Sequence, residues 1–71
     1  MRKNLINERK SKQLTQDETA KLIKVSIRQY KNLEAGTSKG SVDVWQRLKD
    51  LFHKPIDYLL EQVEPNLTEQ E

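Results

Sequence analysis

The stretch TQDETAKLIKVSIRQYKNLEAG, residues 15–36, decides the fold because it contains two helix starts in quick succession. Thr15 with Glu18 three residues later forms a capping box, in which each side chain accepts a hydrogen bond from the other residue's backbone N–H. Ser26 and Gln29 repeat this arrangement eleven residues further on. The sequence therefore predicts two short helices joined by a tight turn.

Apolar residues in the same stretch recur at helical spacing. Ala20 and Ile23 give the earlier helix an inner face, and Tyr30 and Leu33 do the same for the later one. Gly36 suits the left-handed residue that ends a helix. Two helices that cross steeply through so short a connection form a helix-turn-helix unit.

Three further helices are predicted around this pair. Residues 4–12 suit a short helix with a narrow apolar edge, and Pro55 suits the start of a fifth helix. Between them lies the clearest core-facing stripe, formed by Val42, Trp45, Leu48 and Phe52. The predicted fold class is all-α, with five short helices in one domain over residues 1–64. An acidic, flexible tail is expected at residues 65–71.

The composition excludes several kinds of chemistry. The 71-residue chain has no cysteine and one histidine, which rules out disulfides, thiolate metal sites and cysteine nucleophiles. The lone His53 has no clustered partner and makes neither a metal site nor a catalytic base. We therefore expect no enzyme, no metal, no cofactor and no small-molecule ligand.

The location expected from the sequence is the cytoplasm. No apolar run approaches the roughly 20 residues that span a bilayer, and the first residues lack the apolar stretch of a signal peptide. We therefore expect no membrane partner.

Charge is divided unevenly along the chain. The overall net charge is +2, but residues 1–40 carry +6 and residues 41–71 carry −4. A cationic half is typical of proteins that bind a polyanion such as nucleic acid. On charge alone, a solvated helix surface explains the same pattern equally well.

These features together resemble the Cro/lambda-repressor-like (XRE-type) helix-turn-helix regulators, in particular the small single-domain proteins of phages and mobile elements. The likeness covers about Leu5 to Leu60, and the residues that carry it are Gln16, Ala20, Ile23, Val25, Tyr30, Leu33, Glu34 and Gly36. The resemblance implies a lambda-repressor-like domain whose second and third helices form the helix-turn-helix.

Two positions depart from the pattern of that family. Lys24 stands in the turn where glycine is usual, close to the expected end of the second helix, and Thr19 stands where leucine is common. A lysine with positive φ costs about 1 kcal/mol. A buried threonine would need to bond its hydroxyl to a helix carbonyl.

The resemblance places the third helix in the major groove of DNA. The candidate base-contacting residues are then Ile27, Arg28, Lys31 and Asn32. Arg28 could bind O6 and N7 of a guanine, Asn32 could pair with adenine, and Ile27 could pack on a thymine methyl group. The alternative is that the four residues form only the solvated face of this helix.

The DNA backbone would be bound on either side of these residues. Together with Lys31, the candidate phosphate contacts are Gln16, Ser26, Thr37, Ser38 and Lys39. Gln16 and Ser26 lie at helix N-termini, where free N–H groups and the helix dipole favour an anion. Ser26 would cap its helix without DNA as well, and Lys39 could simply keep its loop soluble.

Two further sets of residues follow from the resemblance. Arg9 of the first helix and Glu34 at the end of the third match a structural ion pair, which would orient the third helix. An exposed pair would contribute under about 1 kcal/mol. The expected dimer interface consists of Phe52, Pro55, Tyr58 and Leu59.

The predicted function is sequence-specific binding of double-stranded DNA by a transcriptional regulator, foremost a repressor. A homodimer would read a palindromic operator with half-sites about one DNA turn apart, on the nucleoid of a bacterial or phage-infected cell. The alternative is an antirepressor or antitoxin-like protein that binds another regulator through the same fold. The salt dependence of binding distinguishes the two functions, because the affinity for DNA phosphates falls steeply as the salt concentration rises.

Overall fold

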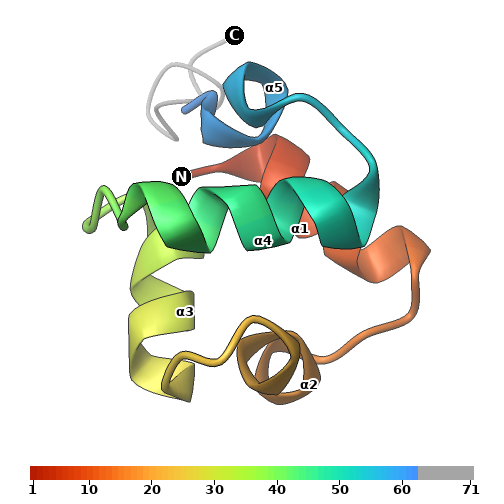
Figure 1. Ribbon diagram of the computed structural model, residues 1–71, viewed down its shortest axis with the longest axis vertical. Coiled ribbons are helices and arrows are strands. Elements are labelled where there is room, and N and C mark those ends of the chain that lie inside the picture. Colours follow the sequence, from red (N-terminus) through yellow and green to blue (C-terminus); the bar gives the residue numbers. More distant parts are fainter. Residues whose placement is uncertain (63–71) are drawn as a thin grey trace, which may run out of the picture.

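The computed structural model describes residues 1–62, and within them the chain forms five α-helices and no strand (Figure 1). The helices are α1 (Lys3–Ser11), α2 (Gln16–Leu22), α3 (Ile27–Ala35), α4 (Val42–Phe52) and α5 (Ile56–Leu60). The predicted all-α fold with five short helices is confirmed. The end of the expected domain after residue 62 and the expected tail at 65–71 lie outside the described residues.

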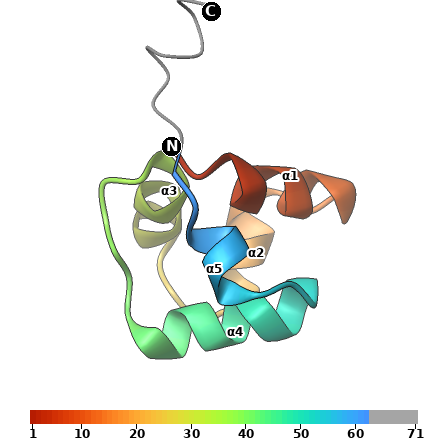
Figure 2. The ribbon, with the colours of Figure 1, turned by 90° about the horizontal axis from the view of Figure 1, so that it is seen from above.

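The helices α2 and α3 lie together on one side of the molecule. In Figure 1, α3 lies in the plane of the view and α2 is seen end-on below α4, so the two helices cross steeply. The helix α5 packs against both α1 and α4 and lies between them in Figure 2. Every helix contributes to one core, whose buried apolar residues are Leu5, Ala20, Ile23, Tyr30, Leu33, Trp45, Leu48, Phe52 and Leu59.

Both predicted capping boxes are present. Thr15 Oγ1 accepts from the Glu18 N–H at 3.0 Å, and Glu18 Oε1 accepts from the Thr15 N–H at 2.8 Å. Ser26 Oγ and Gln29 Oε1 make the equivalent bonds, each at 3.1 Å. Local chemistry therefore determines where α2 and α3 begin.

The turn between α2 and α3 begins earlier than expected. The helix α2 ends at Leu22 rather than near Lys24, because Lys24 adopts a left-handed conformation with φ of 63°. This is the positive φ expected from the departure at this position. The guanidinium of Arg47, on α4, donates to the Ile23 carbonyl at 3.1 Å and so binds the end of α2.

The second departure is also accommodated as the sequence predicts. Thr19 is fully buried, and its hydroxyl donates to the Thr15 carbonyl at 2.9 Å. A buried hydroxyl with a helix carbonyl as partner avoids most of the cost of losing water.

None of the helices within residues 1–62 has the length and apolar character needed to cross a membrane.

Candidate nucleic-acid interface

The helix α3 has two chemically different faces. Its inner face buries Tyr30, Leu33 and Glu34, which hold the helix against the rest of the domain. Its outer face exposes the four residues predicted to contact bases, namely Ile27, Arg28, Lys31 and Asn32. Within residues 1–62, the side chains of Arg28, Lys31 and Asn32 make no hydrogen bond or ion pair. The structure thus brings the four candidates together on one face, and the polar side chains of this face have no partner among the described residues.

The predicted backbone-contacting residues lie at both ends of α3. Ser26 caps the N-terminal end, and Thr37, Ser38 and Lys39 follow the C-terminal end. Gln16 begins α2, but its side-chain amide donates to Glu34 Oε1 at 2.9 Å and so packs beside the last turn of α3. The Lys39 side chain is exposed and without a polar partner among the described residues.

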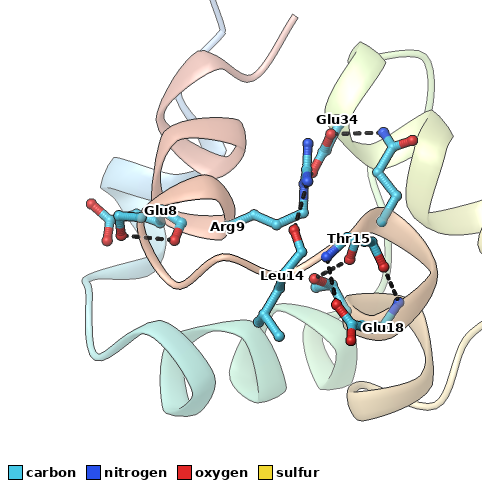
Figure 3. Close-up of polar contacts among 9 residues, drawn as sticks. Glu8, Arg9, Leu14, Thr15, Glu18 and Glu34 are labelled. Carbon is cyan, nitrogen blue, oxygen red and sulfur yellow. Dashed lines mark hydrogen bonds and ion pairs between the residues drawn. The ribbon is translucent and has the colours of Figure 1, made fainter.

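An ion pair fixes the last turn of α3 against α1. Arg9 Nε donates to Glu34 Oε2 at 2.6 Å, and the two side chains are 12% and 4% exposed. The same guanidinium donates through Nη1 to the Leu14 carbonyl at 2.8 Å, so Arg9 lies between Glu34 and the loop before α2 (Figure 3). The pair implied by the resemblance is present in the structure and is largely buried rather than exposed.

Tyr30 lies beside this ion pair with an unsatisfied hydroxyl. The side chain is fully buried, and its Oη makes no hydrogen bond among residues 1–62. Burial, and secondarily the carboxylate of Glu34, raise the pKa of Tyr30 above its ordinary value. Because a buried polar group without a partner is costly, this hydroxyl is a weak point in an otherwise well-bonded region.

Two of the four residues expected at a dimer interface are in the core instead. Phe52 and Leu59 are 2% and 0% exposed within a single chain. Residues with so little surface cannot form the outer face of a subunit, and a core as small as this one requires their apolar area. Pro55 and Tyr58 remain exposed, with the Tyr58 hydroxyl donating to Glu8 Oε2 at 3.1 Å.

Arg2 is a structural residue that sequence reasoning missed. Its side chain is only 3% exposed, and the guanidinium contacts main-chain carbonyls of α3, of the loop after it and of α5. Desolvation lowers the pKa of Arg2 below its ordinary value, although an arginine stays charged. No local pattern could have identified it, because a cation before the first helix looks like an ordinary solvated terminus.

Comparison with known families agrees with this geometry. A family model described as Helix-turn-helix (HTH_3) matches residues 5–59, a range that runs from α1 to α5. The chain belongs to this XRE-type family of helix-turn-helix proteins and is a DNA-binding regulator in the general sense. None of the curated proteins and none of the solved structures matches it.

Proposed function

We propose that the chain is a sequence-specific transcriptional regulator, foremost a repressor, that places α3 in the major groove of double-stranded DNA. The observation that carries the proposal is the outer face of α3, where Arg28, Lys31 and Asn32 have no polar partner within residues 1–62. A helix of this width fits the major groove of B-DNA. Its donors are therefore available for base edges.

Arg28 is the residue proposed to contribute most to specificity. It is exposed in the first turn of α3, and its guanidinium can donate two parallel hydrogen bonds to O6 and N7 of a guanine. Such a contact is worth roughly 1–3 kcal/mol of discrimination between bases. Asn32, one turn further along, is proposed to read adenine, and Ile27, 38% exposed, to pack on a thymine methyl.

We further propose that two copies bind a palindromic operator as a homodimer, on the nucleoid of a bacterial or phage-infected cell. Half-sites about one DNA turn apart would bring both recognition helices to the same side of the duplex. Since Phe52 and Leu59 are buried, the exposed Pro55 and Tyr58 are what remains of the expected interface. Light scattering at micromolar concentration tests this, and a mass of one chain with and without operator would contradict it.

The test of the DNA-binding proposal is a fluorescence-anisotropy titration against a random duplex pool at two salt concentrations, with sequencing of the bound fraction. The unaltered chain should select a palindrome and bind more weakly at the higher salt. Arg28→Ala should erase one base preference, whereas Lys39→Ala, the matched backbone-contact control, should weaken binding to all sequences about equally.

The opposite outcome would favour a protein partner. Absence of binding at low salt would contradict the DNA-binding proposal and leave the antirepressor or antitoxin-like reading. Exposed acidic residues on α4, on α5 and directly after α5, namely Asp43, Asp50, Asp57 and Glu61, would then be the surface to alter in a pull-down experiment.

A further inference from the structure

The end of α3 depends on Arg2 for its carbonyl partners. The last carbonyls of a helix lack partners within the helix, and two of those of α3 are bonded by one residue. The Arg2 backbone N–H donates to the Glu34 carbonyl at 2.8 Å, and Arg2 Nη1 donates to the Leu33 carbonyl at 2.7 Å. A cation at this end also complements the helix dipole.

The same guanidinium extends to the loop at residues 37–40. Arg2 Nη1 donates to the Ser38 carbonyl at 2.8 Å, and Arg2 Nε donates to the Leu60 carbonyl at 3.3 Å. The cation lies 5.1 Å from the centre of the Trp45 ring, and the Trp45 indole N–H in turn donates to the Lys39 carbonyl at 2.6 Å. Two successive loop carbonyls are therefore bonded toward the protein interior.

This arrangement fixes which groups the loop shows to solvent. No peptide bond within residues 1–62 is cis, and a trans peptide directs its N–H opposite to its carbonyl. With the Ser38 carbonyl bonded to Arg2, the N–H of Lys39 points away from Arg2. The exposed Lys39 side chain belongs to the same residue, so one position offers both a backbone donor and an ammonium group to an anion.

We propose that Arg2 is a positioning residue for DNA binding, which holds the loop at residues 37–40 so that Lys39 meets a backbone phosphate. The proposal rests on the proposed function and adds a residue that does not itself touch DNA. A fork of donors is required, because a single guanidinium serves three carbonyls from three segments. Lysine keeps the charge but has no such planar fork.

The experiment is a double-mutant cycle of Arg2→Lys and Lys39→Ala on the full chain, with Lys3→Arg as the matched control at the neighbouring exposed position. Binding to the selected duplex is measured against salt, below the melting temperature of each variant. Because Arg2→Lys conserves net charge, any reduction of its salt slope reports a lost phosphate contact. We expect the slope to fall by about one and the affinity about fivefold, with the base preference at the Arg28 position retained.

The double variant decides between positioning and general stability. If Arg2 acts through Lys39, Arg2→Lys should lower the affinity by a smaller factor once Lys39 is already alanine, because only the backbone N–H of residue 39 is then left to misplace. Multiplicative losses, or an unchanged salt slope in Arg2→Lys, would overturn the proposal.

A fluorescence readout keeps the proposed function separate from this inference. Trp45 is the only tryptophan of the chain, and its indole is bonded to the loop, so its emission should shift in free Arg2→Lys and not in Lys3→Arg. A shift without DNA binding by the unaltered chain would refute the proposed function while showing that Arg2 holds the loop. An unshifted emission would overturn the role of Arg2 itself.

Discussion

The two ends of α3 are held in different ways. At the C-terminal end, the buried Glu34 receives Arg9 and Gln16, and Arg2 bonds the carbonyls around it. At the N-terminal end, the capping box of Ser26 is the local support, and the residues that follow it are exposed. The C-terminal end of α3, called the anchored end below, is bonded to α1, to α2 and to Arg2. The N-terminal end, called the free end, is supported mainly by its own capping box.

The difference suggests that the C-terminal end of α3 sets the direction of the helix and that its N-terminal end supplies the side chains for recognition. A buried, fully bonded polar network restricts the direction of a helix strongly, since its members are costly to leave unpaired. Exposed side chains at the other end keep their donors available for a ligand. Changes at the two ends of α3 should therefore affect different properties, and three substitutions, taken from the largest expected effect to the smallest, test this.

Arg9→Ala should have the largest effect, because it leaves the Glu34 carboxylate buried without its cation. Breaking a buried pair by removing one partner costs about 3–5 kcal/mol. We expect a lower melting temperature and, since α3 loses its anchor, weaker DNA binding, measured by thermal unfolding and anisotropy. The control is Arg9→Met combined with Glu34→Leu, which removes both charges and should regain most of the lost stability. An unchanged melting curve for Arg9→Ala would show that the Arg9–Glu34 pair does not stabilise the fold.

The C-terminal end of α3 is also bonded by Arg2, a contact residue that the sequence did not predict. Thr15 and Ser26 predict the starts of α2 and α3 correctly because a capping box is a local interaction between residues three apart. The exposed face of α3 follows from the same local reasoning, since Tyr30 and Leu33 define the opposite face. Arg2 could not be predicted, because its partners are backbone carbonyls from three distant segments, and a carbonyl carries no sequence signal.

The dimer interface illustrates a second limit. Phe52 and Leu59 were expected at a subunit surface, yet both lie in the core. An apolar residue on a short helix is equally suited to an interior and to an interface, and periodicity does not distinguish the two. In a domain this small, the core requires most of the large apolar side chains that are available.

Ser26→Ala, at the free end of α3, should have a smaller effect on stability than Arg9→Ala. Losing a serine or threonine cap costs about 1 kcal/mol, which thermal unfolding can measure. Thr15→Ala is the matched control, because it removes the same kind of capping box from α2. If Ser26 also contacts a phosphate, only Ser26→Ala should weaken DNA binding beyond what its stability loss explains. Equal DNA affinities for the two variants would show that Ser26 caps α3 and does not contact a phosphate.

Tyr30→Phe should have the smallest effect and the opposite sign. The Tyr30 hydroxyl lies beside the anchor but has no hydrogen bond among the described residues. Removing it relieves a buried unsatisfied group, so we expect the free energy of unfolding to rise by up to about 1 kcal/mol. Tyr58→Phe is the control, because it removes an exposed hydroxyl that has a partner in Glu8 and should give no gain.

The pH dependence of Tyr30→Phe gives an independent check of the same burial. Burial raises the pKa of Tyr30 in the folded state, so the unfolded chain loses this proton first, at a pKa of about 10. The contribution of Tyr30 protonation to the free energy of unfolding is therefore fully present below pH about 10 and is lost as the pH rises above it. Urea unfolding at pH 9 and 11 should show a smaller loss in Tyr30→Phe than in the unaltered chain. An equal loss would mean that the hydroxyl reaches water, and the anchored end of α3 would then be more open than its buried ion pair indicates.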